Sequence, residues 1–84
     1  MTKVKILSEH GLHARPASLI VNALLKYDCD VNFIKDGNKF NAKSIMNIMG
    51  MGLQNGDEIE LDITGEDAEI VEKELLDIFN ELNG

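Results

Sequence analysis

The sequence predicts an α+β fold in which helices cover one face of an antiparallel sheet. The spacing of apolar residues switches between the period of a strand and that of a helix along the chain, and an Asp-Gly pair separates two short runs in the manner of a hairpin. The resulting element order is βαββαβα. With 84 residues the chain can build one compact core, so we expect a single domain over residues 1–84 with two packed layers.

Residues 2–7 alternate between apolar and lysine side chains, which indicates a half-buried strand. The pattern changes after the residues GLHA at 11–14. Pro16 has no N–H and is tolerated only in the first turn of a helix, so it indicates that a helix begins here. The apolar residues that then recur at helical spacing are Ala17, Ile20, Val21, Leu24 and Leu25.

The middle of the chain predicts a hairpin. Strands are expected over Asp30–Ile34 and Lys39–Ala42, joined by a turn over Lys35–Asn38 that contains the Asp-Gly pair. A fourth strand is expected over Glu58–Thr64 after a turn at Gln54–Asp57, because apolar and acidic residues alternate there. The last segment predicts a helix with acidic residues near its start, and its apolar face comprises Ile70, Val71, Leu75, Ile78, Phe79 and Leu82.

A short helix is expected between the hairpin and the fourth strand. Ser44 is a typical N-cap, and Gly50 and Gly52 are typical of a helix end. As a cap, Ser44 would stabilise the helix by about 1 kcal/mol; a phosphoserine at the same place would also be favourable electrostatically. A helix of five or six residues cannot bury the whole cluster of Ile45, Met46, Met49 and Met51, so exposed methionines would form an adaptable docking patch.

Composition excludes several classes of function. Fifteen acidic and eight basic residues give a net charge of −7, which disfavours nucleic acid and favours a protein partner with a basic face. Cys29 is the only cysteine, so an intrachain disulfide is excluded and a reducing, cytoplasmic location is expected. No apolar run approaches the length of a membrane span, and the N-terminal residues do not resemble a signal peptide. We expect a monomer without metal or cofactor.

The stretch GLHARPAS at 11–18 suggests anion chemistry. The start of a helix has unpaired N–H groups and a positive dipole end, which attract an anion and favour a neutral, nucleophilic imidazole at His13. Arg15 can offer several donors to phosphate oxygens, and Pro16 fixes the turn. No nucleotide-binding motif is present, so a phosphoryl group would come from another protein.

Simpler interpretations of these residues stay open at this point. His13 could be a cap or surface residue, Arg15 a solvated surface residue, and Pro16 only a helix starter. His10 and His13 could suggest a metal, but no cysteine or second cluster nearby in the sequence completes such a site.

The sequence resembles the histidine-containing phosphocarrier family, HPr, of the bacterial phosphoenolpyruvate:sugar phosphotransferase system. GLHARPAS is similar to the active-site segment of that family, and NAKSIMNIMGMG at 41–52 to its regulatory-serine segment. The resemblance implies an open-faced sandwich with strand order 1-4-2-3 and three helices on one face. It also implies that His13 accepts a phosphoryl group on Nδ1 from enzyme I and passes it to enzyme IIA components, with Arg15 steadying the phosphate and Pro16 shaping the turn.

The same resemblance implies regulation and docking. Ser44 matches the serine that an HPr kinase/phosphorylase modifies in many Gram-positive relatives. Docking is expected through apolar residues near His13 and on the short helix: Leu12, Ile45, Met46, Met49 and Met51. Two alternatives stay open: a regulatory module that acts through Ser44 and a transcriptional regulator, and a carrier that serves nitrogen or other regulation without sugar transport.

Overall fold

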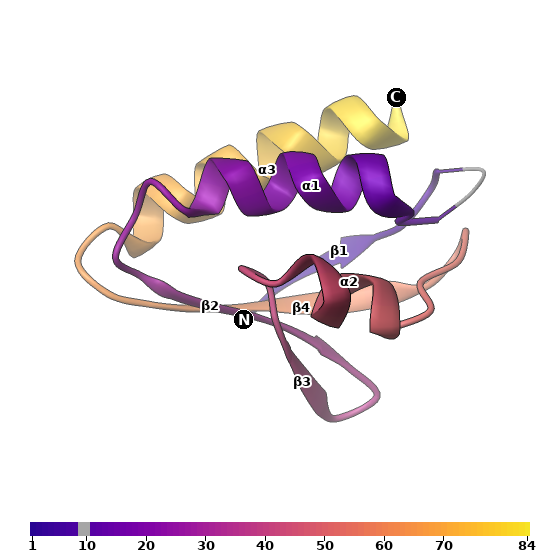
Figure 1. The fold of residues 1–84 in the computed structure, drawn as a ribbon, viewed down its shortest axis with the longest axis horizontal. Coiled ribbons are helices and arrows are strands. Elements are labelled where there is room, and N and C mark those ends of the chain that lie inside the picture. The colour runs from indigo at the N-terminus through magenta and orange to yellow at the C-terminus, as the bar shows by residue number, and fades with distance from the viewer. Residues whose placement is uncertain (9–10) are drawn as a thin grey trace.

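The computed structural model describes residues 1–8 and 11–84. Four antiparallel strands form one sheet in the order β1-β4-β2-β3, and the three helices cover one of its faces (Figure 1). The elements are β1 (Thr2–Lys5), α1 (Ala14–Leu24), β2 (Asp30–Lys35), β3 (Asn38–Asn41), α2 (Ile45–Gly50), β4 (Glu58–Thr64) and α3 (Ala68–Asn83). The predicted order of elements and the strand order are both confirmed.

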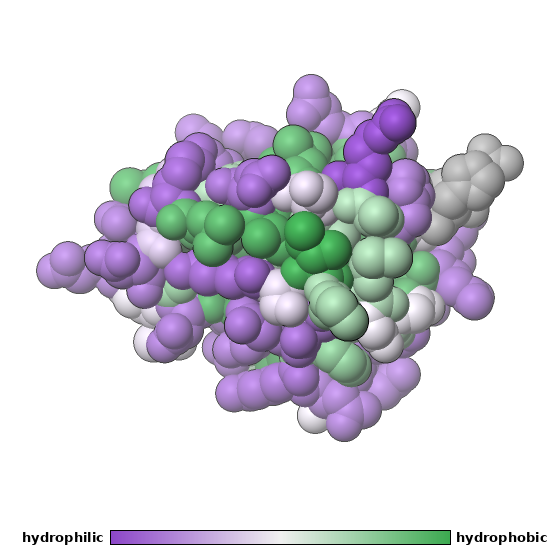
Figure 2. Space-filling model, viewed as in Figure 1, coloured by the Kyte–Doolittle hydropathy of each residue, from purple (hydrophilic) through white to green (hydrophobic). Residues whose placement is uncertain are grey.

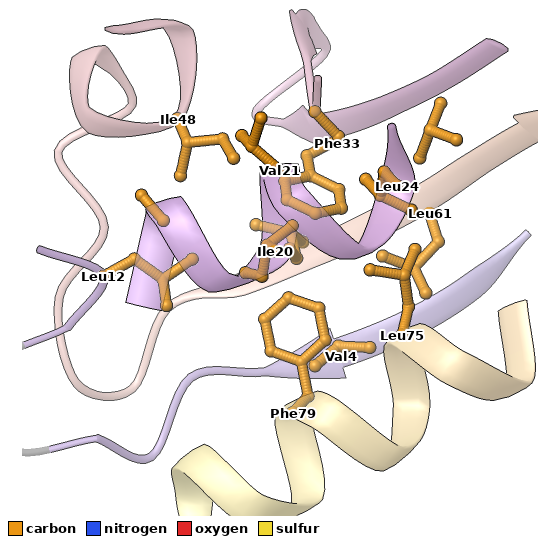
Figure 3. Close-up of a cluster of buried hydrophobic side chains, with 14 of the residues drawn as sticks. Val4, Leu12, Ile20, Val21, Leu24, Phe33, Ile48, Leu61, Leu75 and Phe79 are labelled. Atoms are coloured by element: carbon orange, nitrogen blue, oxygen red, sulfur yellow. The ribbon is translucent and has the colours of Figure 1, made fainter. Parts of the chain in front are cut away.

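Alternate residues of the strands form the floor of the core. In the antiparallel register, Val4 pairs with Ile59 and Phe33 with Leu61, and all four side chains are buried. Successive strand residues point to opposite faces, so the acidic residues between them in β4 lie on the other face. Figure 3 shows Phe79 of α3 and Ile20 of α1 packed over this floor, where the Phe79 and Phe33 rings meet edge to face with centroids 5.9 Å apart.

The hairpin is tighter than the sequence predicts. β2 extends to Lys35 and β3 begins at Asn38, so the turn has two residues instead of four. Asp36 and Gly37 both have positive φ, 52° and 81°, which is the conformation of a primed turn that matches the twist of the strands. β3 also ends one residue early, at Asn41, although the N–H of Ala42 still donates to the Val31 carbonyl at 3.0 Å.

Two helix residues lie outside the apolar faces predicted for them. Leu25 follows the end of α1 and is exposed, and Ile70 lies on the exposed side of α3. In α3 the fully buried residues are Val71, Leu75 and Phe79. Their spacing of four residues defines one narrow stripe; Ile78 and Leu82 are partly buried beside it, whereas Ile70, in the first turn, faces solvent.

The chain just after β1 is held from both sides. The Ile6 N–H donates to the Asp57 carbonyl at 2.7 Å, and the Ile6 carbonyl accepts from the Gly56 N–H at 2.6 Å. On the outer side, the amide of Asn83 donates to the Lys5 carbonyl at 2.8 Å and accepts from the Leu7 N–H at 2.9 Å. These bonds fix the path of the chain as it leaves the sheet toward α1.

Candidate functional site

His13 is the N-cap residue of α1. Its backbone is extended, with φ −95° and ψ −172°, and its carbonyl accepts the first bond of the helix from the Ala17 N–H at 3.0 Å. Pro16 lies in the first turn, as predicted, and is buried, whereas His13 and Arg15 are exposed. The first turn contains no acidic residue, so the positive end of the helix dipole and the Arg15 charge act together on an anion placed here.

The turn before His13 rests directly on another backbone segment. Gly11 has φ +66°, and a Cβ on it would lie 2.0 Å from the Leu53 carbonyl oxygen and 3.1 Å from the Gln54 Cα. The next side chain, Leu12, is buried at the end of the core cluster near Ile48, beside the first turn of α1 (Figure 3). The two residues before His13 are therefore fixed by packing, which sets the direction in which His13 leaves the chain.

The segment 51–57 under this turn is held by one carboxylate. Oδ2 of Asp57 accepts from the Gln54 N–H at 2.9 Å and from Lys35 Nζ at 3.1 Å. Lys35 Nζ also donates to the Met51 carbonyl at 3.4 Å. The backbone hydrogen bond from Gln54, followed by the hydrogen bond and charge of Lys35, holds the pKa of Asp57 below its ordinary value. Sequence reasoning treated residues 54–57 only as a turn and missed this ion pair, because nothing in the local sequence indicates that Lys35 reaches it.

Ser44 is the N-cap of α2, as predicted. Its Oγ accepts from the Asn47 N–H at 3.2 Å, and the Asn47 side-chain amide donates to the same oxygen at 3.2 Å. The helix closes as expected, because Gly52, with φ +63°, donates its N–H to the Met49 carbonyl at 3.2 Å. Ser44 is half-buried, so its hydroxyl is used in the fold and still reaches the surface.

The structure does not bring Ser44 beside His13. The His13 turn packs on residues 53–54, which follow the C-terminal end of α2. Lys43, next to Ser44, instead donates from Nζ to the Tyr27 carbonyl at 2.6 Å, beyond the C-terminal end of α1. The two helices contact each other but run in opposite directions (Figure 1), so the two side chains lie toward opposite ends of a shared surface.

That shared surface is partly apolar. Met46 is 82% exposed, and Ile45 and Met49 are also exposed, as is Leu19 of α1. Figure 2 shows apolar side chains gathered over α1 and α2 on this face. We call Leu19, Ile45, Met46 and Met49 the apolar surface. Sequence reasoning missed Leu19, although its place outside the buried positions 17, 20, 21 and 24 was a signal for exposure.

Two of the five residues expected to dock a partner are buried in the structure. Leu12 and Met51 are each only 6% exposed and belong to the core. Leu12 is buried because the glycine turn folds it under α1, and Met51 because the chain turns inward after α2 toward Leu53. Neither offers contact area to a partner in this conformation.

The described part of the chain, residues 1–8 and 11–84, contains no group of three or more potential metal ligands. His10, which raised the possibility of a metal site, lies outside the described residues. In the same part of the chain, no helix has the length and apolar character to cross a bilayer. Cys29 is a buried thiol without a disulfide.

This chain is similar to known proteins both in sequence and in structure. A family model described as the PTS HPr component phosphorylation site matches residues 1–81. The phosphocarrier protein HPr of Treponema pallidum is 44% identical over 64 residues, which are 76% of this chain and 73% of that protein. The crystal structure of HPr from Thermoanaerobacter tengcongensis has a TM-score of 0.91 and 38% identity, and covers 99% of this chain and 93% of its own.

The chain is also similar to a protein named Crh. The crystal structure of Crh, described as the catabolite repression containing protein of Bacillus subtilis, has a TM-score of 0.79 and 38% identity over 98% of this chain and 94% of its own. That protein is described as a domain-swapped, intertwined dimer, so the expectation of a monomer is not confirmed for this fold. The family match, the sequence identity and the shared sheet order lead to one conclusion: this chain belongs to the HPr family of phosphocarriers of the phosphotransferase system.

Proposed function

We propose that this chain carries a phosphoryl group on His13, which it accepts from phosphorylated enzyme I and passes to enzyme IIA components of sugar transport. The observation that carries the proposal is the exposed His13 at the N-terminus of α1, one residue before Ala14 and two before Arg15, in a first turn without acidic residues. The membership of the HPr family supports the same role. The protein would be a covalent intermediate in the relay and would need no cofactor.

In the proposed transfer, the bond from phosphorus to the donor side chain breaks while a bond from phosphorus to Nδ1 of His13 forms. Phosphoryl transfer of this kind depends on alignment and on stabilisation of charge on the phosphoryl oxygens. The guanidinium of Arg15 and the N–H groups at the start of α1 supply that stabilisation. Pro16 contributes no N–H but fixes the backbone of the turn, which lowers the entropic cost of holding the two side chains.

Partners would dock on the apolar surface. Its exposed methionines are flexible and polarizable, and such side chains adapt to more than one partner. A carrier must leave each partner after transfer, and interfaces of that kind are small. The net charge of −7 favours partners whose docking faces are basic. We place this relay in the cytoplasm, in keeping with the single buried, unpaired thiol at Cys29.

Ser44 is the proposed regulatory site, modified by an ATP-dependent HPr kinase/phosphorylase. Because Ser44 lies at the N-terminus of α2 and away from the His13 turn, a phosphate there would act on docking and not on the reacting atoms. It would place two negative charges beside Ile45 and Met46, at the edge of the apolar surface.

A second candidate function is a regulatory module that acts mainly through Ser44 phosphorylation and a transcriptional regulator. The similarity to Crh, whose description refers to catabolite repression, favours it. The intact GLHARPAS segment favours the relay, since a pure regulator has no use for a nucleophile at position 13.

The experiment that tests the proposal is incubation with phosphoenolpyruvate and enzyme I, followed by intact-mass spectrometry. We expect an acid-labile phosphoryl group on the wild type and none on His13→Ala. Since His13 is exposed, the circular dichroism spectrum of the variant should be unchanged. Labelling of Ser44 by ATP and the kinase, without any labelling of His13, would establish the regulatory module instead.

A further inference from the structure

We infer that Asp57 is a positioning residue for phosphoryl transfer, because it fixes the segment on which the turn that carries His13 rests. The inference depends on the proposed role of His13. Asp57 lies outside the turn and acts through Leu53 and Gly11.

The first step is that the Asp57 carboxylate fixes the segment 51–57 by hydrogen bonds. One oxygen, Oδ2, accepts from the Gln54 N–H at 2.9 Å and from Lys35 Nζ at 3.1 Å. The same ammonium group donates to the Met51 carbonyl at 3.4 Å. Lys35 and Asp57 are both half-buried, with 23% and 31% of their side chains exposed. The ion pair therefore ties the two ends of the segment to each other and to the end of β2.

The second step is the contact of this segment with the chain that leads to His13. The Leu53 carbonyl occupies the space that a Gly11 side chain would fill. At the other end of the segment, Gly56 and Asp57 exchange two backbone hydrogen bonds with Ile6, at 2.6 and 2.7 Å. The chain between β1 and α1 is thus supported at Ile6 and at Gly11, and both supports belong to the segment that the Lys35–Asp57 pair holds.

The third step is the sensitivity of the reaction to this support. Gly11 is two residues from His13, and the buried Leu12 lies between them, so a shift of Leu53 is transmitted through packed groups. Transfer requires near in-line alignment, and small misplacements of a reacting group cost large factors in rate. Removing the ion pair should lower the rate of transfer within the complex, while the apolar surface keeps its affinity for the partner.

The test uses Asp57→Asn with Asp62→Asn as the matched control. Asp62 also forms an ion pair with a lysine, its Oδ2 lying 3.3 Å from Lys39 Nζ, and its side chain is 25% exposed. It follows Leu61, whose side chain is buried, and therefore lies on the opposite face of the sheet from the core. Both substitutions remove one charge and one ion pair, but only the first is connected to the His13 turn.

Single-turnover transfer from phosphorylated enzyme I is measured over a range of carrier concentrations. We expect Asp57→Asn to lower the maximal rate about three- to tenfold, with the concentration at half-maximal rate unchanged and Asp62→Asn close to wild type. Lys35→Met should reproduce the loss, and Lys35→Arg, which keeps the ion pair, should restore most of the rate. Equal maximal rates for Asp57→Asn and Asp62→Asn, or a change only in half-saturation, would overturn the inference.

A second readout does not depend on phosphoryl transfer. Amide hydrogen exchange at Gly11 and Leu12, followed by NMR, should accelerate in Asp57→Asn relative to the amides of α1, and not in Asp62→Asn. If the wild type accepts no phosphoryl group but this acceleration is seen, the proposed function fails while the physical link from Asp57 to the turn stands. If the wild type is phosphorylated and Gly11 exchanges at the wild-type rate in both variants, the positioning role is wrong.

Discussion

The carbonyl oxygen of Leu53 occupies the position that a side chain on Gly11 would take, 2.0 Å from where a Cβ would lie. The turn that leads to His13 therefore depends on the absence of a side chain at residue 11. Gly11 also has φ +66°, a backbone conformation that residues with a side chain adopt only with strain. The close approach and the backbone conformation act at the same residue.

Gly11→Ala should consequently destabilise the fold. Strain from the positive φ costs about 1–3 kcal/mol, and the clash with backbone atoms of Leu53 adds to it because those atoms cannot rotate away. Urea denaturation of the variant and the wild type measures this loss in the free energy of unfolding. Gly50→Ala is the control, since Gly50 has no atom near its Cβ position, and it should be neutral or stabilising by up to about 1 kcal/mol. Equal effects at the two glycines would contradict the packing described for the turn.

Substitutions at Ser44 should separate its capping role from the effect of charge. Ser44→Ala removes the acceptor for the Asn47 N–H and should lower the free energy of unfolding by about 1 kcal/mol. Ser44→Asp keeps an N-cap acceptor and should leave stability near that of the wild type, while its charge weakens docking of enzyme I. Thermal denaturation and the half-saturation of transfer measure the two effects. Unchanged transfer kinetics in Ser44→Asp would remove Ser44 from the regulatory scheme.

Two residues of α2, Met46 and Ile48, should affect different properties: Met46 the docking of a partner and Ile48 the stability of the fold. Met46 is 82% exposed and Ile48 is fully buried. Met46→Ala should change the free energy of unfolding by less than about 0.5 kcal/mol but raise the enzyme I concentration at half-maximal transfer. Ile48→Ala should cost about 2–5 kcal/mol in stability. A Met46→Ala variant with wild-type half-saturation would place the docking surface elsewhere.

The pH dependence of stability should carry a contribution from Asp57. Its folded pKa lies below the ordinary value of 3.8, first because the Gln54 N–H bonds the charged form and second because of Lys35. A group whose pKa falls on folding stabilises the protein above its unfolded pKa. The stability difference between wild type and Asp57→Asn should therefore be constant near neutral pH and shrink as the pH falls below about 4 toward the folded pKa. Urea denaturation between pH 2 and pH 7 measures it, and a difference that grows on acidification would contradict the assigned direction.

Local patterns were sufficient to predict the order of elements, the cap at Ser44 and the place of Pro16. Each of these depends on neighbours in the sequence: alternation in a strand, a hydroxyl before a short apolar helix, or a missing N–H in a first turn. The strand order 1-4-2-3 came instead from the family resemblance, because long-range pairing leaves no local signal.

The errors share a physical cause. Leu12 and Met51 are apolar residues beside a candidate site, and sequence alone does not show that the chain turns each of them inward. The support of the His13 turn was missed for the same reason, since Lys35 reaches Asp57, and Leu53 reaches Gly11, only when a strand end, a loop and a turn come together in space. Local sequence indicates which residues are chemically suited to a site, whereas tertiary packing decides which of them reach the surface.

The side chain of Asn83 has a consequence for how this molecule behaves among copies of itself. β1 is an outer strand of the sheet, and outer strands offer backbone groups on which a strand of another molecule can align, which leads to aggregation or strand exchange. The side-chain amide of Asn83 is already bonded to the Lys5 carbonyl and to the Leu7 N–H, at and just beyond the end of this strand. An incoming strand would first have to displace the Asn83 side chain from Lys5 and Leu7, so a single amide at the end of α3 opposes strand pairing along this part of the edge.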